Sequence, residues 1–200
     1  MSQVEAFLRD LDGRWTLPAG GPITLRLLGS TALILQTDYV RGTKDGDILE
    51  TSEITPAVGA ALIALGGVGT ALAQRHRMYV EILGAAFPFF PDDPVWHRVA
   101  PVELPLVHFQ VEVLDVLDVV IAKLPRYHKT DQDDIAAMVD RDLVDPETFL
   151  ARFRSAVGRW SMDARADDLP RVVRNFHRVQ RDELFVEESE IELPSWIEDD

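Results

Sequence analysis

The sequence predicts an α/β fold with a helical C-terminal part. Residues 25–49 contain an apolar run, a Gly-Ser pair, a second apolar run, a polar stretch and a final apolar pair, which indicates strand, turn, helix, loop and strand. Residues 78–83 alternate, with Met78, Val80 and Ile82 on one side, which predicts another strand. Beyond residue 114 the apolar positions follow helical spacing, so helices are expected there.

The first half of the chain divides into short elements. Val4, Leu8, Leu11 and Trp15 recur at helical spacing and predict an N-terminal amphipathic helix before the turns at 18–22. A strand ending at residue 28, a helix over 31–36 and a strand running to residue 49 follow. The apolar segment 57–74 fits a helix, but its glycines predict a break near residues 66 and 67. A proline-rich aromatic loop that packs follows the strand at 78–83, and strands are expected at 97–105 and 106–113.

The remaining elements are helical. A helix beginning at residue 114 is expected to end at Pro125, followed by helices at 131–139, 145–157 and 169–184. Asp145 is the expected N-cap of the third, with Pro146 in its first turn. From about residue 186 the chain is acidic and is expected to be loosely attached, with Trp196 as the residue that would dock it. The predicted domains are a core at 1–125, a helical region at 126–186 and an acidic tail at 187–200.

Composition excludes several classes of protein. The chain has 200 residues, of which 46% are hydrophobic, so it has enough apolar side chains for a core. The absence of cysteine excludes disulfides, cysteine-based zinc sites and a thiol nucleophile. No serine-hydrolase elbow, Walker P-loop or metal-ligand spacing of histidines occurs. The net charge of -14 argues against broad nucleic-acid binding. A basic cluster nevertheless occurs at Arg171, Arg174, His177, Arg178 and Arg181.

Signals for export or membrane insertion are missing from the sequence. The N-terminus has no basic start followed by an apolar run, and the apolar stretch at 57–68 is short and broken by glycine. A cytoplasmic protein without a membrane partner is therefore expected.

Two aspartates mark the start of the second strand. Asp45 and Asp47 are two residues apart, and side chains at that spacing project from one face of a strand. Two hard carboxylates on one face can hold Mg²⁺ or Mn²⁺, with open positions left for phosphate and water. The alternative is an ordinary polar turn over residues 44–47.

The Gly29-Ser30 turn followed by Asp45-x-Asp47 resembles the nucleotidyltransferase superfamily, which has the polymerase-beta-like fold. The run Arg41-x-Thr43-Lys44 is similar, more narrowly, to AbiEii-type toxins and related minimal nucleotidyltransferases. The resemblance implies a mixed sheet flanked by helices. It also implies that Arg41, Thr43 and Lys44 contribute to nucleotide binding. Gly46 departs from the family pattern, which places a hydrophobic residue between the two aspartates.

The resemblance further implies a triphosphate cradle and a third carboxylate. Gly29 and Ser30 would receive the triphosphate, because backbone N–H groups at a helix N-terminus favour anions. The alternative is a tight turn in which Ser30 is only an N-cap. Glu81 is the best candidate for the third metal-binding carboxylate, with Glu112 as runner-up. An ordinary outward-facing glutamate is the alternative for Glu81.

A second block of residues matches the AbiEii-type pattern. Lys123, then Arg126 or Lys129, then Asp131 and Asp134 follow the family's order. The resemblance implies that Lys123 neutralises nucleotide phosphate charge in the transition state. Asp131 and Asp134 share one face of a helix start and would orient Lys123 or the substrate. The alternative is a capping Asp131 within a solvated run of charges.

These motifs together predict transfer of a nucleoside monophosphate from a nucleoside triphosphate to an acceptor, with Glu81 activating the acceptor hydroxyl. The acceptor is left open among RNA (tRNA for toxin-like members), a protein and a small molecule. A cognate antitoxin protein is a further expected partner. One alternative is a catalytically inactive nucleotidyltransferase fold that acts as a binding or regulatory partner. Another is that the motifs are coincidental turns, in which case Asp45 and Asp47 would lie far from Gly29.

Overall fold

The computed structural model describes residues 1–16, 21–86, 88–100 and 103–197. The chain forms two compact units. The sheet unit comprises Met1–Pro88 and Trp96–Asp115, and the helical unit comprises Phe89–Val95 and Val116–Asp200. The domain boundaries expected after residues 125 and 186 stay a prediction.

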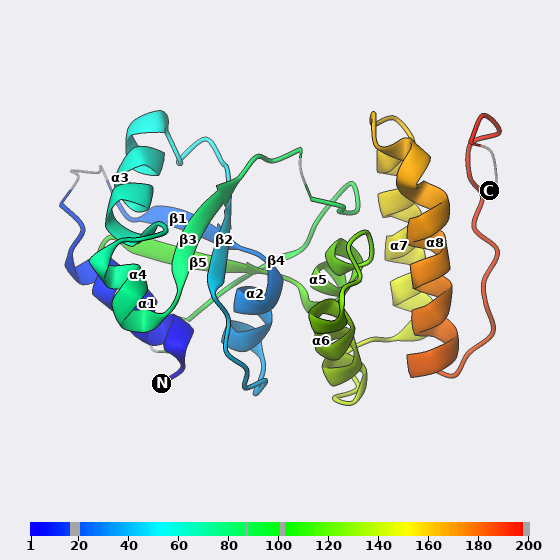
Figure 1. Cartoon of the computed structure of the whole chain (residues 1–200), viewed down its shortest axis with the longest axis horizontal. Coiled ribbons are helices and arrows are strands. Elements are labelled where there is room, and N and C mark those ends of the chain that lie inside the picture. Colours follow the sequence, from blue (N-terminus) through cyan, green and yellow to red (C-terminus); the bar gives the residue numbers. More distant parts are fainter. Residues whose placement is uncertain (17–20, 87, 101–102, 198–200) are drawn as a thin grey trace. The chain divides into compact units, whose positions relative to one another are not determined.

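A mixed five-stranded sheet organises the sheet unit (Figure 1). The strand order is β3-β2-β1-β5-β4. Strand β1 pairs in parallel with β5 and antiparallel with β2, while β2 pairs in parallel with β3 and β4 pairs antiparallel with β5. The strands are β1 (Ile23–Leu27), β2 (Asp45–Leu49), β3 (Tyr79–Leu83), β4 (Trp96–Arg98) and β5 (Phe109–Leu114). The predicted α/β class, with a mixed sheet flanked by helices, is confirmed.

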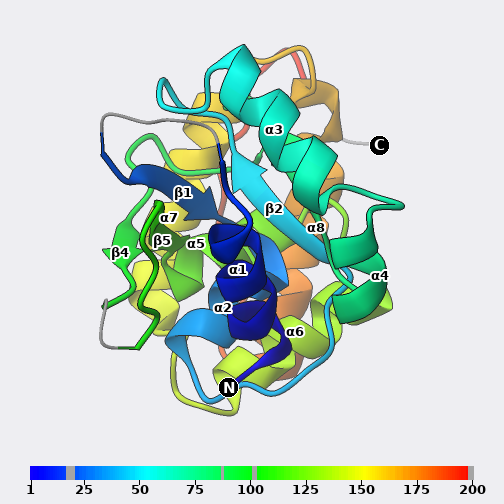
Figure 2. The ribbon, with the colours of Figure 1, turned by 90° about the vertical axis from the view of Figure 1, so that its left-hand side faces the viewer.

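One face of the sheet is covered by helices α1 (Gln3–Gly13), α3 (Pro56–Gly66) and α4 (Ala71–His76), which Figure 2 views from the front. A Cβ added at Gly66 would lie 3.1–3.3 Å from Phe7 and Leu11 of α1 and from Val80 of β3. Since side chains alternate along a strand, Val80 and its neighbours at every second position face these helices. Tyr79 and Glu81 therefore project from the opposite face.

Helix α2 (Gly29–Gln36) connects β1 to β2 and contacts β2 and β5. Its last residue, Gln36, donates a side-chain hydrogen bond of 2.7 Å to the carbonyl of Leu114 at the end of β5. This bond ties the C-terminal end of α2 to the sheet. The predicted strand–turn–helix–loop–strand order over residues 25–49 is confirmed.

The break predicted in the segment 57–74 is confirmed, because α3 ends at Gly66 and α4 begins at Ala71. The strand predicted over 97–105 is wrong in extent, since β4 spans only Trp96–Arg98. The N–H groups of Glu103 and Leu104 bond to the carbonyl of Ala100, so they are not available to a neighbouring strand. Part of this prediction, residues 101 and 102, lies outside the described residues.

Strand β5 begins at Phe109, three residues later than the sequence predicts. The cause is Asp12 of α1, a buried residue whose carboxylate accepts backbone hydrogen bonds from Val107, His108 and Phe109 at 2.8–3.2 Å. These N–H groups therefore have a side-chain acceptor and are not available to a neighbouring strand.

Four α-helices, with a 3₁₀ turn before the last and a π turn after it, make up the described helical unit. Phe153 of α7 and Phe176 of α8 stack with ring centroids 4.0 Å apart, and Phe89 packs against Trp160 at 4.7 Å. The aromatic loop therefore packs into a core, as predicted. Asp145 caps α7 by accepting from the Thr148 N–H at 2.8 Å, which confirms that assignment. The elements are α5 (Val116–Lys123), α6 (Lys129–Val139), α7 (Pro146–Trp160), the 3₁₀ turn (Ala166–Asp168), α8 (Leu169–Arg178) and the π turn (Val179–Glu183).

The acidic tail follows the π turn, and polar contacts hold it. Gln180 exchanges two hydrogen bonds with Ser189, and Arg154 of α7 donates to the carbonyl of Glu190. Trp196 is 58% exposed. The prediction that Trp196 docks the tail is therefore wrong.

None of the helices within the described parts of the chain combines the length and apolar character needed to cross a membrane. The cytoplasmic location stays a prediction.

Candidate functional site

The glycine turn and the acidic pair meet at one point of the sheet unit. Strands β1 and β2 are antiparallel, with Leu27 opposite Ile48, and the Leu28 N–H then donates to the Asp47 carbonyl at 3.0 Å. The next residue, Gly29, begins α2 with a φ of 58°. A Cβ at Gly29 would lie 3.1 Å from Asp47 Oδ2. The alternative in which Gly29 lies far from the aspartates is therefore wrong.

Gly29 is required at this turn for two reasons. A positive φ is unfavourable for residues with a Cβ, and the Asp47 carboxylate occupies the space that a side chain would need. The N-cap of α2 is Leu28, which has no side-chain capping bond. The alternative that Ser30 is the N-cap is wrong, because Ser30 lies inside the first turn. Gly29 and Ser30 therefore lie in the first turn of α2, where backbone N–H groups and the helix dipole favour a negative charge.

Two buried threonines hold the backbone and the carboxylate of Asp45. The Thr43 hydroxyl lies 3.1 Å from the Asp45 carbonyl oxygen and 3.2 Å from Asp45 Oδ1. The Thr31 hydroxyl, from the first turn of α2, donates to the same carbonyl at 3.0 Å. Helix α2 and the loop before β2 therefore fix the start of the strand together.

Glu81 lies beside Asp47 on the neighbouring strand. Strands β2 and β3 are parallel, with Tyr79 opposite Asp45 and Glu81 opposite Asp47, so all four side chains share a face. Burial raises the pKa of the Tyr79 phenol, and the negative charges of Glu81, Asp45 and Asp47 raise this pKa further. The phenol is therefore neutral at pH 7 and available as a hydrogen-bond donor close to three carboxylates.

The runner-up for the third carboxylate is engaged elsewhere. Glu112 lies on β5, which β1 separates from β2, and its carboxylate accepts from Arg26 Nε at 2.9 Å. An ion pair across neighbouring strands accounts for this residue.

The metal-binding role of Asp45, Asp47 and Glu81 stays a prediction. Across the described ranges, 1–16, 21–86, 88–100 and 103–197, no three acidic or histidine side chains are close enough together to hold a metal ion. The donor chemistry of the aspartate pair nevertheless fits Mg²⁺, which commonly takes one or two carboxylates and completes its octahedron with phosphate and water oxygens.

Gly46 does not disrupt the strand. All five residues of β2 are in register with β3, and Gly46 faces the helices, where an added Cβ would lie 2.8 Å from the Met78 terminal methyl group. The buried Met78 side chain occupies the space that a hydrophobic residue would fill at this position. The departure from the family pattern is thus compensated by packing.

The other predicted nucleotide-binding residues of this block surround the turn before β2. Arg41 Nε donates to the Gly42 carbonyl at 3.2 Å, so its guanidinium lies along the loop. Lys44 is exposed, and its carbonyl accepts from the Tyr79 N–H at 2.8 Å. Their contacts with nucleotide, like those of Thr43 and Ser30, stay predictions.

The second predicted block forms a buried ionic cluster in the helical unit. Lys123 Nζ at the end of α5 lies 3.2 Å from Asp131 Oδ1 and 2.8 Å from Asp134 Oδ2, both in α6. Asp131 also accepts two bonds from Arg126, at 2.8 and 2.9 Å, and one from the His128 N–H at 3.0 Å. Asp131 therefore caps α6, as the alternative expects. The solvated part of that alternative holds for Lys129 and Asp133 but is wrong for the buried Lys123, Asp131 and Asp134.

Burial on its own would raise the pKa of the Asp131 carboxyl. Hydrogen bonds from Arg126 and the charge of Lys123 outweigh that effect and hold the pKa below its ordinary value. Asp131 is therefore ionised at neutral pH, and one of the two predicted tasks of the aspartates, orienting Lys123, has a direct structural basis. The phosphate-neutralising role of Lys123 and the nucleotide contacts of Asp131 and Asp134 stay predictions.

Thr31 and Tyr79 are the residues that the sequence reasoning missed. Thr31 directly follows the Gly-Ser pair, and a hydroxyl in the first turn of that helix is the signal that points to it. Tyr79 stands two residues before Glu81 in an alternating strand, so the sequence indicates that both side chains lie on the same face of the sheet.

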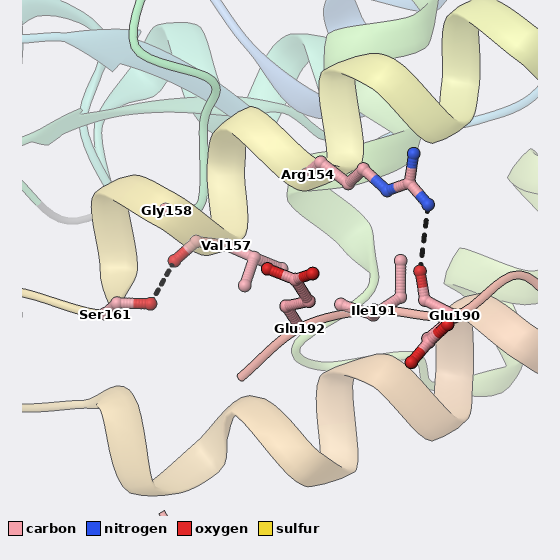
Figure 3. Close-up of a pocket in the computed structure, with 7 residues that line it drawn as sticks. All are labelled: Arg154, Val157, Gly158, Ser161, Glu190, Ile191 and Glu192. Carbon is pink, nitrogen blue, oxygen red and sulfur yellow. Dashed lines mark hydrogen bonds between the residues drawn. The ribbon is translucent and has the colours of Figure 1, made fainter. Parts of the chain in front are cut away.

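The helical unit contains a cavity of about 440 Å³ between α7 and the acidic tail (Figure 3). Val157 and Gly158 line its α7 side, and Ile191 and Glu192 line its tail side. A bond from Arg154 to the Glu190 carbonyl connects the two sides (Figure 3). None of the residues singled out from the sequence lines it.

The sheet, the glycine turn and the aspartate pair define an α/β protein of the nucleotidyltransferase class. A family model described as "Nucleotidyltransferase of unknown function (DUF6036)" matches residues 18–181, and the chain belongs to this family. No match was found among curated proteins or among solved structures.

Proposed function

We propose that this chain transfers a nucleoside monophosphate from a nucleoside triphosphate to an acceptor hydroxyl, with Mg²⁺ or Mn²⁺ bound. The observation that carries the proposal is the contact between the start of α2 and Asp47, where a Cβ at Gly29 would lie 3.1 Å from the carboxylate. The helix start that would receive the triphosphate thus lies against the strand that would hold the cation. Membership of a nucleotidyltransferase family supports the proposal.

Each residue has a separate task in the proposed reaction. Asp45 and Asp47 hold the cation, which when bound would neutralise phosphate charge and stabilise the attacking and leaving oxygens. Gly29 and Ser30 receive the triphosphate on backbone N–H groups. Glu81 takes the proton of the acceptor hydroxyl, whose oxygen attacks the α-phosphorus while pyrophosphate leaves. Thr43 and Thr31 keep Asp45 in place.

Cationic side chains complete the proposal. Arg41 and Lys44 flank the triphosphate, because they belong to the loop that leads directly into the aspartate pair. Lys123 supplies positive charge in the transition state, held by Asp131 and Asp134. The order of these residues supports an AbiEii-type enzyme, with RNA or tRNA as acceptor and a cognate antitoxin as partner. A protein or small-molecule acceptor uses the same chemistry.

A second candidate is a catalytically inactive nucleotidyltransferase fold that binds a partner. The observation that favours it is that Glu81 is exposed and no three-carboxylate metal site occurs in the part of the chain that the structure describes. The departure of Gly46 from the family pattern does not add to this argument, because β2 stays in register with β3 and Met78 packs beside the glycine.

Incubation with each α-³²P-labelled nucleoside triphosphate, Mg²⁺ or Mn²⁺, and total RNA or total protein tests the proposal. We expect label on one acceptor class with the wild-type chain and none with Asp47→Asn. Absence of label with all four nucleotides and both metals would favour the inactive candidate.

A further inference from the structure

A pocket of about 300 Å³ lies in the sheet unit, where α4 ends and strands β2 and β3 begin. Tyr79 lines this pocket and also belongs to the face that carries Asp45, Asp47 and Glu81. The pocket is therefore beside the strand pair of the candidate site. Its lining residues are Lys44, Gly69, Ala73, Gln74, Arg77, Met78 and Tyr79.

Two cationic side chains flank an apolar floor in this pocket. Lys44 and Arg77 are exposed. Among the described residues, neither has an ion-pair partner. Ala73 and Met78 are buried and contribute the apolar surface. Long cationic side chains add their aliphatic stems to such a surface while their charges stay in water.

Arg77 has a backbone conformation that a side chain disfavours. It ends α4 with φ 53° and ψ 34°, in the left-handed region where glycine is usual. Its N–H bonds to the Ala73 carbonyl, a contact that glycine would make equally well. The helix end therefore does not need the arginine side chain, and a strained residue lining a pocket points to a function for that side chain.

We propose that this pocket binds a phosphate monoester attached to a planar apolar group, and that this ligand is the anionic end of the acceptor. An arginine fork and a lysine point charge suit a phosphate, and the apolar floor suits a ring. In a chain of net charge -14, anion binding requires such a local pair of cations. The acceptor assignment rests on the proposed function, whereas binding itself does not. A small molecule and the phosphorylated end of a nucleic acid share this chemistry.

Titration of the whole chain with phenyl phosphate, without divalent cation, tests the pocket. Arg77→Gly is the decisive variant, because it removes the cation and relieves the positive φ, so its melting temperature should not fall. We expect at least a fivefold loss of affinity in Arg77→Gly and in Lys44→Ala. Arg75→Ala is the matched control, since Arg75 lies in the same helix, is paired with Asp10 at 2.9 Å and does not line the pocket. It should change affinity less than twofold.

Absence of binding by the wild-type chain, or equal losses in Arg77→Gly and Arg75→Ala, would overturn the pocket assignment. Asp47→Asn should bind phenyl phosphate normally, because Asp47 does not line this pocket. Adenosine 5′-monophosphate then represents a small-molecule ligand, and a 5′-phosphorylated hexaribonucleotide represents the end of a nucleic acid. The one that binds more tightly, and loses affinity in Arg77→Gly, identifies the source of the ligand. If binding depends on Arg77 but no nucleotide is transferred to any acceptor, the pocket stands and the proposed function fails.

Discussion

The Thr43 hydroxyl lies 3.2 Å from Asp45 Oδ1 and 3.1 Å from the carbonyl oxygen of the same residue. Thr43 is buried, so this bond is shielded from solvent. Through it the loop before β2 sets the orientation of the first aspartate of the pair.

Replacement of Thr43 by valine should weaken cation binding more than folding. Valine keeps the shape but removes the hydroxyl, so we expect a loss of about 1 kcal/mol in the free energy of unfolding and a clear loss of Mn²⁺ affinity by isothermal titration. Thr31→Val is the control, because the Thr31 hydroxyl bonds to the backbone carbonyl of Asp45, whereas the Thr43 hydroxyl also contacts its carboxylate. Equal Mn²⁺ affinity in both variants would rule out a positioning role for Thr43.

Replacement of Lys123 by methionine should destabilise the protein strongly. The change leaves the buried carboxylates of Asp131 and Asp134 without their shared cation, and removing one partner of a buried ion pair costs about 3–5 kcal/mol. Chemical unfolding measures this, and Lys123→Met/Asp134→Asn should recover part of the loss. Lys129→Met is the control, because Lys129 and its partner Asp133 are both exposed, and it should change stability by less than about 0.5 kcal/mol.

The same variants separate the two roles of Lys123. If Lys123 serves only the cluster, the stabilised double variant should regain the nucleotide-transfer rate along with its fold. A folded double variant without transfer activity would support the predicted role in neutralising phosphate charge.

Acid should remove the contribution of Asp131 to stability. Its pKa is lower in the folded protein than the ordinary value of 3.8, so the unfolded chain binds the proton more readily. The stabilisation is therefore complete above the unfolded pKa and is lost as the pH falls from about 4 through the lower folded pKa. Unfolding measured between pH 6 and pH 2 should show a smaller acid dependence in Arg126→Ala. An unchanged pH profile would contradict the assigned cause.

Packing around Gly46 makes a separate prediction. Gly46→Val should cost about 1–3 kcal/mol by overpacking against Met78, and Met78→Ala in the same chain should recover much of this loss. Thermal unfolding of the two variants provides the comparison. Failure of Met78→Ala to recover any stability would show that Met78 does not fill the space beside Gly46.

The sequence predicted the parts of the fold that depend on local patterns. Alternation gave the strand at 78–83, and the glycine cluster gave the break between α3 and α4. The strand predicted at 97–105 ends early because the N–H groups of Glu103 and Leu104 bond to the nearby carbonyl of Ala100. The start of the strand predicted at 106–113 was wrong because it depends on a distant partner. Asp12 is about a hundred positions away in the chain and takes the N–H groups that precede β5.

In the candidate site, too, some features could be predicted from the sequence and others depend on the folded structure. The order of Gly29 and Asp47 in the chain indicated a shared site, and their antiparallel register brings them together. The burial of Lys123 was not predictable, since a run of charges with helical spacing is usually solvated. Lys123, Asp131 and Asp134 become buried together when α5 and α6 fold and pack.

The coupling between Gly29 and Asp47 in nucleotide binding tests the central claim most directly. Isothermal titration with nucleoside triphosphate and Mn²⁺ should be done on the wild-type chain, Gly29→Ala, Asp47→Asn and the double variant, each confirmed as folded. One shared site predicts that each single change lowers affinity about tenfold or more and that the double variant binds little more weakly than the worse single. Unchanged affinity in either single variant, or losses that simply add, would contradict the account.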